Sequence, residues 1–265
     1  MTDDGAAPAG AARAMVGGPG AGAAGVRAGA AGFGGTTPVP HRATMWWARP
    51  VGWFLDHVAY RTTVYGRENV PRDAPVLFAG NHLSYLDGPV MFGASPVPMH
   101  ILVKQEMFTG FLGSVLRGSG QIPVDRAHGR QALNTAKSLL DAGRSVGILP
   151  EGTRGSGTAA SLSNGVAWLA LHTDAVVVPV GITGTRREGE HLDHVPRPGR
   201  RFAVGFGEPL RLSRQAGESG RASMDRAAEE IRQALVTEVS RVVRRSGLQL
   251  PDGSVEPAGT RLEKV

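Results

Sequence analysis

Short apolar runs alternate along this chain with longer segments of helical periodicity, and this alternation limits the possible folds more than any other feature. Strand-like runs are expected near residues 62–66, 75–80, 99–103, 121–124, 145–149, 176–182 and 202–206. Helices are expected near residues 84–94, 108–117, 129–142, 163–172 and 222–245. Such alternation predicts an α/β fold: a single domain with a mostly buried mixed sheet flanked by helices.

Composition sets the expected ends of this domain. Residues 1–40 contain 23 Gly and Ala residues, four charged residues and no periodic apolar pattern. A segment of this kind cannot bury a core. We therefore predict a disordered tail at 1–40, one domain at 41–247 and a second disordered tail at 248–265.

Cysteine content and charge exclude several classes of function. The chain has no cysteine, which excludes disulfides, thiol nucleophiles and zinc–thiolate sites. The formal net charge of +6 favours anionic partners. No zinc finger, ribonucleoprotein motif or DNA-reading helix is recognisable, so we expect no nucleic-acid partner. The N-terminus lacks a secretory h-region, and no uncharged apolar run approaches the roughly 20 residues that span a bilayer.

An aromatic-rich segment at 45–60 opens the expected domain. It contains three tryptophans, a phenylalanine and an interleaved arginine: Trp46, Trp47, Arg49, Trp53 and Phe54. This composition is typical of a segment lying in a membrane interface. An N-terminal helix packed on the domain would fit as well, and Pro50 and Gly52 argue against a long continuous helix.

A histidine followed five residues later by a carboxylate lies just after the expected strand at 75–80. Polar residues at the carboxyl ends of strands are where α/β folds place chemistry. Imidazole can take a proton near neutral pH, and a carboxylate on its other nitrogen fixes the tautomer. On an unbroken helix the two side chains would point about 140° apart. His82 should therefore lie on a turn, as a general base, with its partner Asp87 in the first helical turn.

Two structural interpretations of this segment remain open. Ser84 and Asp87 have the spacing of a capping box, so Asp87 could simply satisfy the start of a helix. A single histidine beside a strand also serves structural roles in many folds.

Three further segments follow in order and favour the catalytic interpretation. They are Gly120–Arg126, Leu149–Arg154 and Val177–Ile182. Together with the His82–Asp87 segment and with Gly66–Pro71 ahead of it, they resemble the family of 1-acylglycerol-3-phosphate acyltransferases. The resemblance runs from about residue 64 to about residue 210.

The resemblance implies a function, partners and a location. The activity would move a fatty acyl group from acyl-CoA or acyl-carrier protein to the free hydroxyl of 1-acylglycerol-3-phosphate, forming phosphatidate. No cofactor is expected, since the acyl donor thioester is a co-substrate. The partners would be this donor, a lysophospholipid acceptor and a membrane surface. We expect a peripheral protein at the cytoplasmic face of the cell membrane.

The resemblance also assigns an acceptor site. Arg126 and Arg154 each end a turn after an expected strand, so both can reach the sheet edge of His82, and guanidinium matches phosphate geometry. By resemblance these two arginines hold the acceptor's glycerol phosphate. The remaining implied substrate-binding residues are Lys104, Glu151, Gly152 and Thr153. Taken singly, each arginine could instead be a solvated surface charge.

One departure from the family pattern concerns the acceptor. The family usually carries a lysine shortly before the glycine that corresponds to Gly165, and Ser163 stands at that place. The acceptor could therefore be another lysophospholipid, glycerol phosphate or a lipid amine. A non-catalytic lipid-binding protein is a further alternative.

Three other motifs are set aside. Residues 143–147 match a nucleophile elbow, but the expected order is helix then strand, the reverse of what an elbow needs. Residues 20–25 match a dinucleotide fingerprint, but no strand precedes them. A polar cluster in a Gly- and Pro-flanked loop could serve a metal-assisted hydrolase, yet such loops are usually solvated, and we predict no metal site there. Its members are Glu188, Glu190, His191, Asp193 and His194.

Overall fold

The computed structural model describes residues 47–125, 129–151, 154, 156–158 and 163–251. Contacts divide the chain into Met1–Gly35 and Thr36–Val265, and all described residues belong to the second unit. The predicted tail at 1–40 lies outside the described residues. Of the tail predicted at 248–265, residues 248–251 are described, and Leu250 packs against Leu235 and Val239. The rest of that tail lies outside the described residues.

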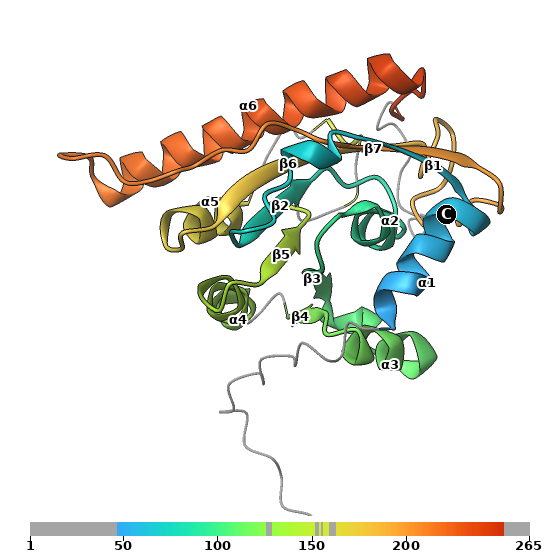
Figure 1. The fold of residues 1–265 in the computed structure, drawn as a ribbon, viewed down its shortest axis with the longest axis horizontal. Helices are drawn as coiled ribbons and strands as arrows, with labels where there is room; N and C mark the ends of the chain where they lie inside the picture. Colours follow the sequence, from blue (N-terminus) through green and yellow to red (C-terminus); the bar gives the residue numbers. More distant parts are fainter. Residues whose placement is uncertain (1–46, 126–128, 152–153, 155, 159–162, 252–265) are drawn as a thin grey trace, which may run out of the picture. The chain divides into compact units, whose positions relative to one another are not determined.

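A seven-stranded mixed sheet forms the centre of the described part of the chain (Figure 1). Its strands are β1 (Arg61–Tyr65), β2 (Val76–Gly80), β3 (Met99–Lys104), β4 (Ile122–Val124), β5 (Ser145–Ile148), β6 (Val176–Thr183) and β7 (Arg201–Phe206). The order across the sheet is β1-β7-β6-β2-β5-β3-β4. All neighbours pair in parallel except β6 and β7, which are antiparallel. The predicted mixed sheet is confirmed.

Helices cover both faces of this sheet (Figure 1). Those of the described residues are α1 (Ala48–Phe54), the π-helix η2 (Leu55–Ala59), the 3₁₀ turns η3 (Arg67–Asn69) and η4 (Gln105–Met107), α2 (Asp87–Ala94), α3 (Gly110–Gly118), α4 (Gly129–Asp141), α5 (Asn164–Leu171) and α6 (Gly220–Ser246). Helix α2 packs on one face, with α1 beside it, while α4, α5 and α6 pack on the other.

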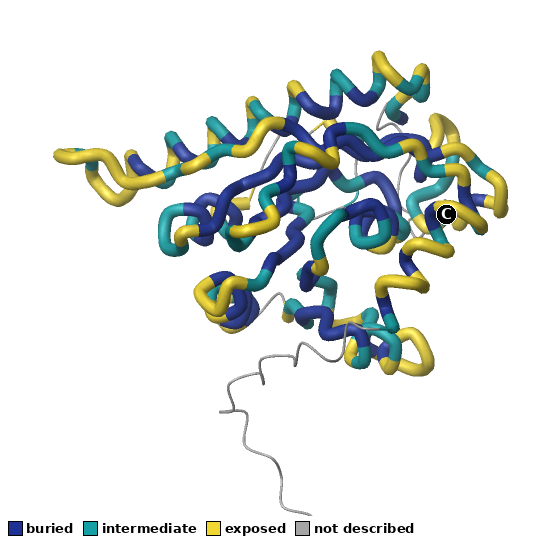
Figure 2. The backbone as a smooth tube through the Cα atoms, viewed as in Figure 1, coloured by how far each residue is buried: buried dark blue, intermediate teal, exposed yellow. Residues whose placement is uncertain are grey.

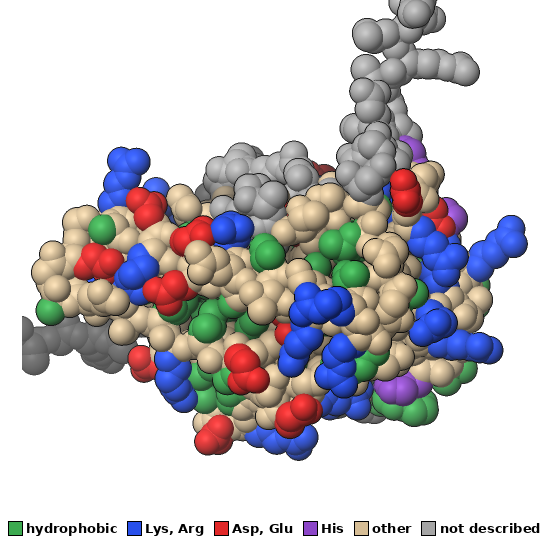
Figure 3. Space-filling model, turned by 90° about the horizontal axis from the view of Figure 1, so that it is seen from above, with side chains coloured by type: hydrophobic (Ala, Val, Ile, Leu, Met, Phe, Trp, Pro, Cys, Tyr) green, Lys and Arg blue, Asp and Glu red, His purple; other side chains and the backbone are tan. Residues whose placement is uncertain are grey.

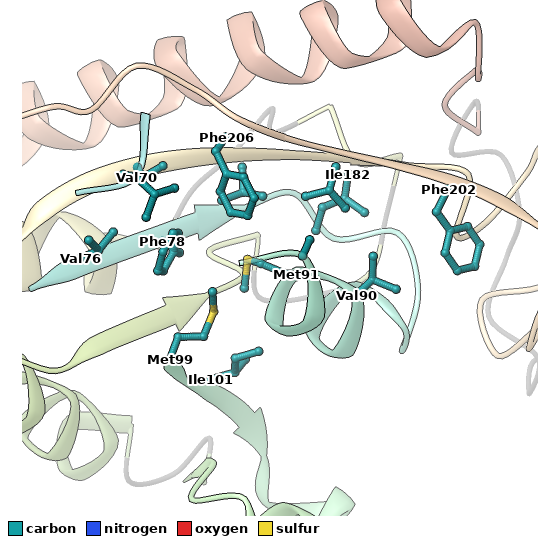
Figure 4. Close-up of a cluster of buried hydrophobic side chains, with 14 of the residues drawn as sticks. Val70, Val76, Phe78, Val90, Met91, Met99, Ile101, Ile182, Phe202 and Phe206 are labelled. Carbon is teal, nitrogen blue, oxygen red and sulfur yellow. The ribbon is translucent and has the colours of Figure 1, made fainter. Parts of the chain in front are cut away.

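Alternating side chains of β2 divide the core into two layers. Phe78 joins Met91 of α2 in the cluster on one face (Figure 4). Leu77 faces the other way and joins Leu139 of α4 and Leu169 of α5. The central strands are dark blue throughout in Figure 2, because helices cover both of their faces. Strands buried on both faces read as continuous apolar runs, which explains why the sequence pattern locates them well.

The described part of segment 45–60, which begins at residue 47, packs on the domain and also presents apolar side chains outward. Ala48, Gly52 and Asp56 form a buried stripe at a spacing of four. The backbones of Gly52 and Gly93 lie so close that a Cβ on Gly93 would clash with the carbonyl oxygen of Gly52. Pro50 falls in the first turn, where no backbone N–H is needed. Neither Pro50 nor Gly52 interrupts the helix, but α1 is only seven residues long and passes into the π-helix η2, which ends at Ala59.

Asp56 lies buried in this contact and gives a testable dependence of stability on pH. Burial raises its pKa from 3.8 to about 7, against the opposing effects of Thr62 and Arg67. A carboxyl whose folded pKa is raised binds protons more tightly in the folded state. Its contribution to stability is therefore greatest below about pH 4, falls as pH rises, and levels off above about pH 7.

We predict that the free energy of unfolding of Asp56→Asn, taken relative to that of the wild type, increases as pH rises from 4 to 7. The increase should be about 1.4 kcal/mol for each pH unit between the ordinary pKa of the Asp56 carboxyl, 3.8, and its raised pKa of about 7. Urea unfolding at several pH values measures it. Asp225→Asn, at an exposed position of α6, is the matched control and should show no such trend. A constant difference between Asp56→Asn and wild type across this range would contradict the raised pKa.

Candidate active site

His82 and Asp87 meet at the carboxyl end of β2. His82 lies on the turn after the strand, and Asp87 is the first residue of α2. The Nδ1 atom of His82 lies 2.9 Å from Oδ2 of Asp87. The predicted contact and its predicted placement on turn and helix are confirmed. The His82 side chain keeps 15% of its surface exposed, whereas that of Asp87 is fully buried.

The carboxylate of Asp87 accepts hydrogen bonds from several directions. Its Oδ2 atom also accepts from the backbone N–H groups of Leu83 at 2.5 Å and Ser84 at 2.7 Å. Its Oδ1 atom accepts from the hydroxyl of Thr185 at 2.6 Å. These donors compensate for the burial of a carboxylate. The backbone donors Leu83 and Ser84 both lie before α2, so the carboxylate shapes the turn and holds the histidine. The capping interpretation is wrong, because the N-cap residue of α2 is Leu86 and has no side-chain cap.

The contact with Asp87 settles which nitrogen of His82 is available for chemistry. Because a carboxylate accepts hydrogen bonds, Nδ1 carries the hydrogen in this pairing. The lone pair then lies on Nε2. This tautomer lets Nε2 take a proton from a hydroxyl, while the carboxylate stabilises the imidazolium that forms.

Asn81 fastens the turn to the neighbouring strand β6. Its side-chain amide donates to the carbonyl of Ile182 at 2.9 Å, and its side-chain oxygen accepts from the N–H of Ile182 at 2.7 Å. The amide thus continues the β2–β6 pairing past the last residue of β2. Sequence reasoning missed this role, because an Asn between a strand and a turn reads as an ordinary loop residue.

The loop after β6 contacts the same turn. Arg186 is almost completely buried, and its Nε donates to the carbonyl of Leu83 at 3.1 Å. Thr185 precedes it and reaches Asp87. Strand β6 itself is fully buried, as predicted for the segment containing Pro179. The pair Thr185–Arg186 was not predicted, and its only signal is a Thr and an Arg directly after that apolar segment.

Glu151 and Arg154 also lie at the turn. The Oε1 atom of Glu151 accepts from the backbone N–H of His82 at 3.2 Å. The guanidinium of Arg154 stacks on the ring of Tyr85, 3.7 Å from its centre, and donates to the Tyr85 hydroxyl at 3.0 Å. Arg154 therefore shares the sheet edge of His82, as predicted.

A loop carboxylate already binds Arg154. Its Nη1 atom donates to Oδ1 of Asp193 at 2.8 Å and to the carbonyl of Leu192 at 2.5 Å. Hydrogen bonds from Arg154 and Tyr85 hold the pKa of Asp193 below its usual value, so it is charged at neutral pH. The alternative of Arg154 as a solvated surface charge is wrong, since only 14% of its side chain is exposed.

Of the other residues singled out in the sequence, the structure describes some and leaves others outside the described ranges. Lys104 ends β3, which runs in the same direction as β2, so it lies at the same edge of the sheet. Ser163 precedes α5, and its N–H donates to the carbonyl of Pro150 at 2.7 Å. Arg126, Gly152 and Thr153 lie outside the described residues.

Side chains of the loop cluster at 188–194 form ion pairs. Glu190 binds Arg200 and lies 3.4 Å from His194. The hydrogen bond from Arg200 lowers the pKa of Glu190 to about 2. Within the described part of the chain, no group of three or more His, Cys, Asp or Glu residues is arranged to hold a metal ion.

Comparisons with known proteins find similarity to acyltransferases. Residues 61–183 match the family model described as Acyltransferase. Over 124 residues the chain is 34% identical to a 1-acyl-sn-glycerol-3-phosphate acyltransferase of Bacillus subtilis, covering 46% of this chain and 62% of that protein. A protein of the same description from Borreliella burgdorferi is 33% identical over 127 residues, covering 46% of this chain and 51% of its own. The chain thus spans less than two thirds of either relative.

A solved structure shares the fold. The crystal structure of the 1-acyl-sn-glycerophosphate acyltransferase PlsC from Thermotoga maritima aligns with a TM-score of 0.56 at 21% sequence identity. The alignment covers 75% of this chain and 78% of that one. The predicted fold, an α/β domain like that of glycerolipid acyltransferases, is confirmed.

Proposed function

We propose that this chain, which carries an acyltransferase-family domain at residues 61–183, moves a fatty acyl group from a thioester to the free hydroxyl of 1-acylglycerol-3-phosphate, forming phosphatidate. The observation that carries this proposal is the His82–Asp87 pair at the end of β2, with Arg154 on the same turn. The activity named for both relatives supports the choice of acceptor.

The pair supplies the proton transfers of this reaction. Nε2 of His82 takes the proton of the acceptor hydroxyl as that oxygen attacks the thioester carbonyl. Asp87 stabilises the imidazolium through Nδ1. The tetrahedral intermediate then collapses, the carbon–sulfur bond breaks, and the leaving thiolate takes the proton back from Nε2. The substrate's own alcohol replaces the serine of a hydrolase triad, so no acyl-enzyme is needed.

Arg154 is the proposed anchor for the acceptor's phosphate. Its guanidinium fork matches two phosphate oxygens, and stacking on Tyr85 keeps it beside the turn of His82. Arg126 and Lys104 are the proposed further basic contacts, and Glu151, Gly152 and Thr153 would shape this pocket. The Oε1 atom of Glu151 accepts from the N–H of His82, which joins the pocket to the base.

A membrane surface is the proposed source of the acceptor. The outer sides of α1 and η2 expose large apolar residues, and so does α3 (Figure 2). They are Val51, Trp53, Phe54, Val58, Phe111 and Leu112. No helix in the described ranges has the length and apolar character to cross a bilayer. Figure 3, which looks onto the α6 side, shows Lys and Arg side chains gathered over one half of that face. The exposed aromatic side chains of α1 suit adsorption to a lipid surface, and the net charge of +6 favours an anionic one, at the cytoplasmic side of the membrane.

The decisive experiment measures thiol release from acyl-CoA, and in parallel from acyl-carrier protein, with and without lysophosphatidate. Wild type should release thiol only when acceptor is present. His82→Ala should lower kcat about 10²-fold or more, the usual contribution of a general base. His172→Ala is the matched control, since that ring stacks on Trp168 in a different part of the fold. Release without acceptor would indicate a hydrolase, and no release from either donor would favour the lipid-binding alternative. An undiminished rate in His82→Ala would rule out His82 as the base.

Arg154→Ala should raise the KM for lysophosphatidate about tenfold or more, because a charge-assisted contact to phosphate is lost. The KM for monoacylglycerol, which lacks the phosphate, should stay within about twofold of the wild-type value. Arg232→Ala on α6 is the control. An equal loss with both acceptors would mean that Arg154 supports the turn rather than the phosphate.

The double variant Trp53→Ser, Phe54→Ser should bind anionic vesicles at least about tenfold more weakly than wild type, because two exposed aromatic side chains are removed. Co-sedimentation with phosphatidylglycerol vesicles measures this, with phosphatidylcholine vesicles for comparison. Acyl transfer to acceptor below its micelle-forming concentration should be unchanged. Undiminished vesicle binding would place the membrane contact elsewhere.

A further inference from the structure

We propose that Thr185 is a positioning residue for the proposed acyl transfer, acting on His82 through the carboxylate of Asp87. The inference rests on the proposed function for its kinetic consequence and on the geometry alone for its structural one. Thr185 lies 98 residues from Asp87 in the sequence and comes from the loop that follows β6.

The two oxygens of Asp87 have different partners. Oδ2 accepts from Nδ1 of His82 and from the N–H groups of Leu83 and Ser84, all within its own segment. In the described part of the chain, Oδ1 accepts from the Thr185 hydroxyl. Donors on one oxygen leave the other free to swing, because the terminal torsion of an Asp side chain is soft. A donor on each oxygen fixes the plane of the carboxylate, and with it the direction of the His82 ring.

The loop is built to deliver this hydroxyl. Gly184 follows the last residue of β6 with a φ of 90°, and a Cβ there would stand 2.5 Å from the carbonyl oxygen of Arg201. Only glycine fits this turn without strain, and the turn directs the next residue toward α2. Arg186 then ties the loop to the carbonyl of Leu83, so the chain is held on both sides of the contact.

Burial makes the hydroxyl hard to replace. Thr185 and Asp87 are both fully buried, so water does not have ready access to Oδ1 if the donor is lost. An unpaired buried hydroxyl would itself be unfavourable, so the residue's polar atom is explained by this bond. A hydrogen bond to a charged group is strong enough to change a rate about ten- to one-hundred-fold.

The test compares Thr185→Val, which keeps the shape without the hydroxyl, with Thr185→Ser, which keeps the hydroxyl. Thr185→Val should lower kcat about ten- to one-hundred-fold and leave both KM values within about twofold. Thr185→Ser should restore kcat to within about threefold of wild type. Thr183→Val is the matched control, because Thr183 is equally buried but its hydroxyl donates to the carbonyl of Gln249. If Thr185→Val does not fold, Thr185→Ala repeats the comparison.

A second readout does not depend on activity. The Nδ1–H proton of His82 should give a downfield proton resonance that disappears in His82→Ala. Its exchange with water should be slow in wild type and in Thr185→Ser, and at least about tenfold faster in Thr185→Val.

Each outcome decides the question. Unchanged kcat and unchanged exchange in Thr185→Val would overturn the positioning role, and so would a Thr185→Ser variant as impaired as Thr185→Val. A third outcome is that neither the wild type nor any variant transfers acyl groups, while proton exchange is faster in Thr185→Val but not in Thr185→Ser. In that case Thr185 still positions Asp87 and His82, and the proposed reaction fails.

Discussion

Burying the carboxylate of Asp87 is the physical requirement on which the rest of the site depends. A buried charge needs a donor for each of its oxygens, and here the donors come from three places: the turn, the histidine ring and the loop after β6. Each donor therefore fixes the position of its own segment. The shape of the turn, the tautomer of His82 and the path of the chain beyond β6 are consequences of satisfying one side chain.

Much of this arrangement could be predicted from the sequence, and the reason is local. Strands buried on both faces read as apolar runs, so β2 and β6 lie within one residue of their predicted positions. The His82–Asp87 contact followed from a spacing of five residues. Helix α2 was predicted three residues too early, because the N–H of Leu86 is satisfied by the Ser84 hydroxyl in the turn and the helix begins only at Asp87.

The unpredicted part of the site consists of contacts between distant segments. Asn81 and Ile182 are 101 residues apart, and Arg154 and Asp193 are 39 apart. Before folding, these polar residues resemble any other loop residues. The Arg154–Asp193 pair also changes how the anion site should be understood. If Arg154 anchors the acceptor as proposed, a phosphate would have to exchange with a carboxylate already bound to the guanidinium. Its affinity would then reflect the difference between two anions rather than the attraction of a bare cation.

The close approach of Gly52 and Gly93 has a mechanical consequence. Neither Gly52 nor Gly93 has a side chain to separate the two helices at this point, so we expect little relative movement between α1 and α2 there. Helix α2 carries Asp87 at its first residue, and α1 carries the outward-facing Trp53 and Phe54. With α1 adsorbed to lipid as proposed, the height of His82 above the bilayer is set by the fold itself and not by a flexible tether. In the proposed reaction, the protein would then meet its acceptor at one fixed depth of the headgroup layer.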